Sequence, residues 1–189
     1  MIYYATDANL QSQYISLYES EGRRVVMMPS MLDVRFAEAI EQNREKTRFV
    51  RVDAEIDALK TESEAEANEE LIALFAAFAS EGQTLKVELH NLKNESVPAI
   101  LNVSEESRRM QEMMKMYAPD APAMPADETL VLNGACPLVR RLASGELGEK
   151  KQAVARQIYR LAQISARTLT AEEMKSFLAD SYALLSEFR

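Results

Sequence analysis

Short apolar runs alternate with amphipathic segments over the first third of the chain. The runs at 2–6, 25–28 and 49–52 are rich in β-favouring residues and predict three short strands. The segment 9–20 has apolar residues at helical spacing and is followed by Gly22, which is typical of a helix end. Ser30 can cap a second helix that runs to about Arg44. Because crossovers between parallel strands are right-handed, this pattern predicts a small parallel βαβαβ sandwich. Its second helix should face inward through Leu32, Phe36, Ala39 and Ile40.

An acidic, alanine-rich stretch then interrupts the apolar pattern. Thr61 and Glu64 have capping-box spacing and predict a helix that extends to Ser80. That helix becomes amphipathic only from Leu71 onward, so its first half has no apolar face to bury. We therefore interpret residues 53–68 as a solvated connector.

The remaining sequence predicts a mixed α+β domain with a three-stranded sheet. Strands are expected at 85–90, 99–103 and 130–132, and helices at 104–117 and 137–144. Two longer helices are expected to form a C-terminal helical hairpin: one spans 149–166, and the other begins with a capping box of Thr170 and Glu173. The predicted fold class is thus α/β plus α+β. The predicted divisions are 1–53 (small α/β/α subdomain), 54–84 (acidic connector and amphipathic helix) and 85–189 (C-terminal dimerisation domain).

Both helices of the hairpin carry an apolar stripe. A hairpin that is apolar on both helices has more apolar face than one small sheet can cover. Two explanations fit these stripes equally well on the residues alone: packing against the chain's own domain, or packing against a second copy. The residues that we predict at a two-fold interface are Val154, Ile158, Leu161, Phe177, Leu178, Tyr182, Leu185 and Phe188.

A methionine-rich segment occupies the helix predicted from Ser104. Methionine is flexible and polarizable, so a methionine-rich surface can adapt to many apolar partners. The alternative is that these methionines, like most methionine stripes at helical spacing, belong to the hydrophobic core. A proline-rich loop follows the helix and basic residues flank it, which favours an exposed face. The candidate binding residues are Met110, Met113, Met114, Met116 and Tyr117.

Composition excludes several classes of function. A net charge of −8 disfavours nucleic acid, and neither a signal peptide nor an apolar run long enough to span a membrane is present. The single cysteine, Cys136, fits a reducing compartment, for which the cytoplasm is the default. The single histidine, His90, excludes a histidine-rich metal site. The first turn lacks the glycines of a nucleotide-binding loop. With these features taken together, we expect no catalytic residues, cofactor or metal in this sequence.

Several segments, in order, resemble the late middle domain and C-terminal domain of the heat shock protein 90 chaperones, especially the bacterial ones. They are IYYATD, VVMMPSMLDVRF, LKVELHNLKNESVPAILNVSEESRRMQEMMKMY and ETLVLNGACPLVRRL, followed by the last forty residues. The resemblance implies a homodimer joined by a four-helix bundle, with unfolded client proteins contacting the methionine-rich helix at Met113, Met116 and Tyr117. Where bacterial relatives place a tryptophan near a client-contacting patch, this chain has Arg35 and Phe36. We expect Phe36 to be core.

The resemblance also implies that ATP and Mg²⁺ bind to an N-terminal domain, and that a catalytic arginine comes from the early middle domain. Neither region is in this sequence, so we expect a fragment of a longer ATPase that has no ATPase activity itself. Two alternatives remain. One is an assembly module that dimerises without binding clients; the other is a small enzyme with a ligand near Asp7, Ser30 and Asp53, at the carboxyl ends of the first three strands.

Overall fold

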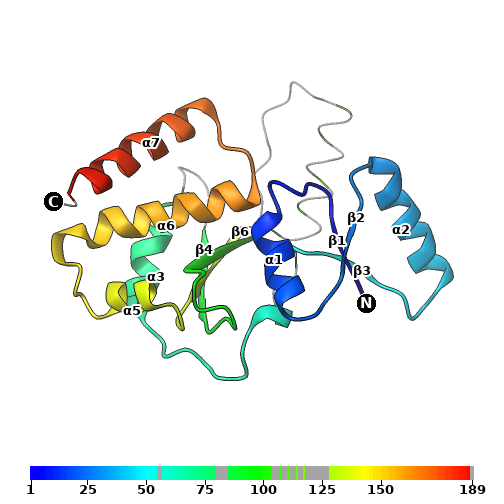
Figure 1. Ribbon diagram of the computed structural model, residues 1–189, viewed down its shortest axis with the longest axis horizontal. Coiled ribbons are helices and arrows are strands. Elements are labelled where there is room, and N and C mark those ends of the chain that lie inside the picture. Colours follow the sequence, from blue (N-terminus) through cyan, green and yellow to red (C-terminus); the bar gives the residue numbers. More distant parts are fainter. Residues whose placement is uncertain are drawn as a thin grey trace.

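The computed structural model describes residues 1–54, 57–79, 85–103 and 128–187, together with Ser107, Met110, Met114 and Tyr117, and leaves aside the side chains of Met31 and Val34. Its first region is the predicted parallel sandwich, shown in blue in Figure 1. The elements are β1 (Ile2–Ala5), α1 (Ser12–Ser20), β2 (Val25–Met27), α2 (Met31–Asn43) and β3 (Phe49–Arg51). The strands are parallel in the order β2-β1-β3.

The two helices cover opposite faces of this sheet. Tyr3 of β1 packs with Tyr14 and Tyr18 of α1, whereas the adjacent Tyr4 packs with Ala37 of α2. This alternation follows from the period of two along a strand.

The predicted inward face of α2 was wrong. Leu32 is 75% exposed and Phe36 is 65% exposed, and Ala39 is exposed as well, whereas Ala37 is buried. A three-stranded sheet offers α2 a narrow surface, on which Tyr4, Met28 and Ala37 form a small cluster. Such a surface buries only one line of the helix, so Leu32 and Phe36 face solvent and Ile40 is half-buried.

A buried polar cluster closes the carboxyl edge of the parallel sheet. The side-chain amide of Gln11 donates to Asp53 at 2.7 Å, and Arg51 lies 3.0 Å from the other oxygen of that carboxylate. The oxygen of the same Gln11 side chain accepts from the backbone N–H groups of Thr6 and Asp7. Gln11 thereby joins the start of α1 to the ends of β1 and β3.

The connector differs from its prediction at two points. A 3-10 helix, η1 (Asp57–Leu59), buries Leu59, and helix α3 (Glu69–Ala76) begins at the cap residue Asn68 rather than at Thr61. The capping box predicted at Thr61 was wrong because its segment has no apolar face whose packing could stabilise a helix. The N–H of Thr61 instead donates to the carbonyl of Asn91.

The second region is the predicted mixed domain. Its sheet has the order β4-β6-β5, with β4 (Lys86–His90) parallel to β6 (Glu128–Asn133) and β5 (Ala99–Val103) antiparallel to it. The helices that follow are α5 (Pro137–Ala143), the 3-10 turn η2 (Gly148–Lys150), α6 (Lys151–Ala166) and α7 (Ala171–Ser186). Helices α6 and α7 form the predicted hairpin, coloured yellow to red in Figure 1.

Both faces of this second sheet are covered. One face packs against α3, α5 and α6 through residues such as Leu101, Leu130 and Ile158. The other face packs against the small subdomain, because Ile100 and Val131 share a hydrophobic cluster with Tyr14. The two regions are therefore joined by a common core.

Polar contacts reinforce the junction between the two regions. The hydroxyl of Tyr14 donates to the carbonyl oxygen of Leu101 at 2.7 Å. Ser165 of α6 bonds to Gln13 at 2.7 Å, and Lys93 pairs with Glu21 at 2.6 Å. These contacts place α1 against both the sheet and the hairpin helix α6.

Candidate protein-interaction surfaces

Helix α7 has its apolar residues on the outside of the molecule. It is 16 residues long, and none of these residues, all of which the structure describes, is buried. By helical spacing, its exposed Met174, Leu178, Tyr182 and Leu185 lie on one face. Leu161 of α6 is also exposed, at 46%. An exposed apolar face of this kind is typical of a surface that packs against another apolar surface.

The seam between α6 and α7 is partly polar. The side-chain amide of Gln157 donates to Ser181 at 2.9 Å, and the Ser181 hydroxyl is also 2.6 Å from the carbonyl oxygen of Phe177. The buried Oδ2 of Asp180 has no hydrogen-bond partner among the residues that the structure describes. Polar groups therefore share the seam with the half-buried Phe177, whereas Leu178, Tyr182 and Leu185 lie outside it.

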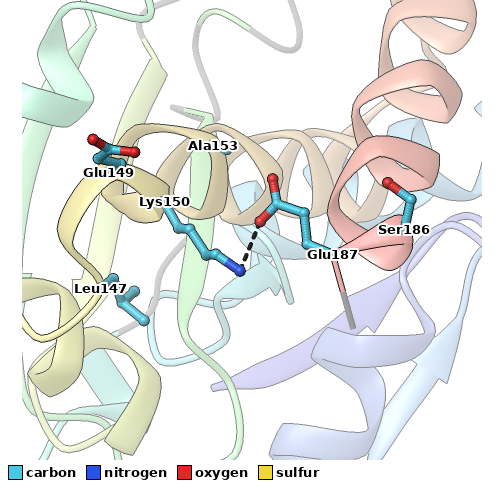
Figure 2. Close-up of a pocket in the computed structure, with 6 residues that line it drawn as sticks. All are labelled: Leu147, Glu149, Lys150, Ala153, Ser186 and Glu187. Carbon is cyan, nitrogen blue, oxygen red and sulfur yellow. Dashed lines mark ion pairs between the residues drawn. The ribbon is translucent and has the colours of Figure 1, made fainter. Parts of the chain in front are cut away.

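Ion pairs tie both ends of the hairpin. At the turn, the guanidinium of Arg167 donates to both carboxylate oxygens of Glu173, at 2.9 and 2.7 Å. Glu173 and Thr170 also form the capping box predicted for α7. At the open end, Lys150 pairs with Glu187 at 2.8 Å within an open depression that Leu147, Glu149, Ala153 and Ser186 also line (Figure 2). These pairs set the position of α7 without burying it.

The turn network shifts two pKa values strongly. The hydrogen bond from Arg167 lowers the pKa of Glu173 from 4.5 to about 2. Burial, followed by the charge of Glu128, raises the pKa of the Tyr159 hydroxyl to about 12. Arg160 and Glu128 extend the network, at 3.6 Å from Glu173 and 3.9 Å from Arg167, respectively. At neutral pH the Glu173 carboxylate is ionised and Tyr159 is neutral.

Replacing Glu173 with Gln is expected to lower the free energy of unfolding by about 2 kcal/mol at pH 7, because charged hydrogen bonds are lost. The folded-state pKa lies below the ordinary value, so this stabilisation is complete above about pH 5 and is lost as the pH falls through 2. Urea unfolding of both proteins from pH 7 to pH 2 measures the difference. A difference that does not shrink toward pH 2 would contradict this assignment.

The predicted interface residues fall into two groups. Leu161, Leu178, Tyr182 and Leu185 are exposed, and Phe177 is half-buried against the hairpin. Val154 is half-buried against the protomer's own core, and Ile158 is 2% exposed within that core. Phe188 lies outside the described residues. Sequence reasoning missed the polar seam, although Gln157, Asp180 and Ser181 interrupt the apolar stripes at helical spacing.

The methionine-rich helix is described at Ser107, Met110, Met114 and Tyr117, which are helical and share one face by their spacing. Met110 is 43% exposed and Tyr117 is 76% exposed, whereas Met114 is half-buried. Met113 and Met116 lie outside the described residues. The described part of this helix thus presents apolar side chains to solvent.

The polar residues of the enzyme alternative have local structural partners. Asp7 accepts from the N–H groups of Asn9 and Leu10, and Ser30 caps α2 in a capping box with Asp33. Asp53 is fully buried. Among the described residues, no group of three or more His, Cys, Asp or Glu is placed to hold a metal ion. No helix in the described part of the chain is long and apolar enough to cross a bilayer.

Exposed apolar faces of this kind are typical of surfaces that bind other proteins. No protein-family model matches the chain. The chain is 33% identical over 165 residues to the chaperone protein HtpG of Bacteroides fragilis, strain 638R. The matched segment covers 80% of this chain and 24% of that protein. The chain is also 33% identical to the HtpG of Bacteroides thetaiotaomicron over 76% of this chain and 23% of that protein.

A third relative, the HtpG of Porphyromonas gingivalis, strain W83, is 28% identical over 86% of this chain and 26% of that protein. The chain therefore spans about a quarter of the length of the relatives it matches. The resemblance to the heat shock protein 90 family is confirmed: the chain is related to HtpG chaperones of this class.

Proposed function

We propose that the chain is the C-terminal part of a cytoplasmic, ATP-dependent chaperone of the heat shock protein 90 class, which dimerises and holds unfolded client proteins. ATP and Mg²⁺ would bind to an N-terminal domain of the longer protein, and this part would hydrolyse no ATP. The relationship to HtpG chaperones supports the class. The two exposed apolar surfaces support assembly and client binding as separate activities.

The observation that carries the dimer is the outward apolar face of α7. Exposed apolar patches of this kind mark protein interfaces, and helical hairpins associate as four-helix bundles. Leu161, Leu178 and Leu185 would bury against the same surface of a second copy. We expect sedimentation velocity to give twice the chain mass of 21.3 kDa. A protein concentration of roughly tens of micromolar suits a dimer of micromolar affinity. A monomer at that concentration would exclude the proposed dimer.

Client binding is supported by the exposed face of the methionine-rich helix. Met110 and Tyr117 are exposed and offer a flexible and an aromatic contact, respectively. The exposed Leu32 and Phe36 of α2 add a second apolar area. This chain lacks the tryptophan that bacterial relatives place near a client-contacting patch, so the proposed client site is the methionine-rich helix alone.

The double substitution Met110→Ser with Tyr117→Ser tests the helix. We expect the variant to suppress the aggregation of a heat-denatured protein at least about threefold less well, because each truncation removes roughly 1 kcal/mol of apolar contact. Light scattering at equal chaperone concentrations measures the effect. Met110→Leu with Tyr117→Phe, which keeps both side chains apolar and of similar size, is the matched control and should suppress aggregation as well as the parent sequence does.

The aggregation assay also distinguishes a chaperone from an assembly module that dimerises without binding clients. If the double variant remains a dimer and suppresses aggregation as well as the parent sequence, the methionine-rich helix is not a client site. A dimer that suppresses no aggregation in either form would instead be a structural module.

A further inference from the structure

Strand β2 is an open edge of the small parallel sheet. Successive residues of β1 bond to the strands on its two sides. The carbonyl oxygen of Ala5 accepts from the N–H of Met28 on the β2 side, and the carbonyl oxygen of Tyr4 accepts from the N–H of Val52 on the β3 side. In this register Val26 directs its N–H and C=O toward β1. Val25 and Met27 consequently direct theirs away from the sheet. Within the described residues, no hydrogen-bond partner satisfies these two donors and two acceptors.

The β3 and β5 edges are blocked by side chains of the same chain. On β3, the N–H of Phe49 donates to the Glu41 carboxylate at 2.6 Å. On β5, the antiparallel register directs the carbonyl of Leu101 outward, where it accepts from the Tyr14 hydroxyl. Side chains therefore occupy the backbone groups that another strand would need.

The β4 edge is protected differently, by charge. Lys86, Glu88 and His90 alternate along this strand, and Glu88 lies 2.7 Å from Lys86 and 3.0 Å from His90. Charged side chains along an edge strand discourage the addition of another strand. Strand β2, Val25-Val26-Met27, carries no charge, and Val26 and Met27 are 46% and 44% exposed.

We propose that β2 binds an extended apolar segment of a non-native polypeptide by strand addition. This inference rests on the proposed client binding and specifies how one client segment is held. An extended backbone presents alternating N–H and C=O groups, which match the four outward groups of Val25 and Met27. The exposed Val26 and Met27 side chains contact the apolar residues of the added strand, and main-chain recognition makes the site tolerant of client sequence.

Amide hydrogen exchange of the full 189-residue chain, followed by NMR, tests the inference directly. The probe is a synthetic ten-residue peptide of alternating valine and lysine, which is apolar on one side and soluble. We expect saturating peptide to slow exchange at Val25 and Met27 about tenfold or more, because both amides become hydrogen-bonded. Val26, whose amide already bonds to β1, serves as the internal control. Peptide binding without slower exchange at Val25 and Met27 would overturn the proposal.

Two substitutions separate main-chain from side-chain recognition. Met27→Pro removes an outward N–H that none of the described strands uses, and Met27→Thr keeps this N–H while removing the apolar side chain. We expect Met27→Pro to weaken peptide binding about tenfold, and Met27→Thr about threefold or less. Equal losses would show side-chain recognition and overturn the proposal. If Met27→Pro does not fold, the exchange measurement on the unaltered chain decides.

Failure here is distinguishable from failure of the proposed function. If the peptide does not bind and the chain still suppresses aggregation, strand addition at β2 is wrong and client binding elsewhere stands. If the chain neither binds the peptide nor suppresses aggregation, both proposals fail.

Discussion

The double substitution Leu178→Asp with Leu185→Asp is expected to make the protein monomeric at every practical concentration. Both leucines are exposed in the single chain, so neither aspartate disrupts the protomer's own core. In the proposed bundle, two carboxylates per protomer would lose water and face their copies across a two-fold axis. We expect the dimer Kd to rise at least about a thousandfold, which corresponds to roughly 4 kcal/mol. Sedimentation velocity over a concentration series measures the change.

A matched control lies on the other side of the same helix. Ser176 and Ala183 are exposed, and helical spacing places them well away from Leu178 and Leu185. Changing both to aspartate adds the same charge to α7 and should leave the dimer intact. If both aspartate pairs weaken the dimer equally, charge repulsion explains the result; if neither does, the interface lies elsewhere.

The secondary structure could be predicted because local signals agreed with the fold. The parallel strands, the helix cap at Ser30, the capping box at Thr170 and the C-terminal hairpin all follow from patterns within a few residues. The errors came from packing that local patterns do not contain. The small sheet leaves Phe36 of α2 in solvent, and the acidic segment after Thr61 has no surface on which a helix could pack.

The candidate surfaces were predictable only in part. The apolar spacing of Leu178, Tyr182 and Leu185 identified a helix face, and the structure shows that this face is exposed. The open β2 edge could not be foreseen, because it depends on the strand order β2-β1-β3 and on side chains such as Glu41 that block another edge. Such features depend on residues far apart in the sequence.

Tyr14→Ala is expected to lower the free energy of unfolding by about 3–5 kcal/mol, the range for removing a large buried aromatic side chain. Tyr14 is 1% exposed in the core shared by both regions, and its hydroxyl bonds to Leu101. Tyr14→Phe keeps the ring and should cost about 1–3 kcal/mol, because the carbonyl of Leu101 loses its partner. Urea unfolding followed by circular dichroism measures both losses.

Phe36→Ala is the matched control, because it removes an aromatic side chain that is 65% exposed. It should change the free energy of unfolding by no more than about 0.5 kcal/mol. A loss as large as that of Tyr14→Ala would show that α2 packs through Phe36 after all. Because Tyr14 joins the small subdomain to the sheet that supports α6, its loss should also separate one unfolding transition into two. A single transition in Tyr14→Ala would mean that the shared core couples the regions without this side chain.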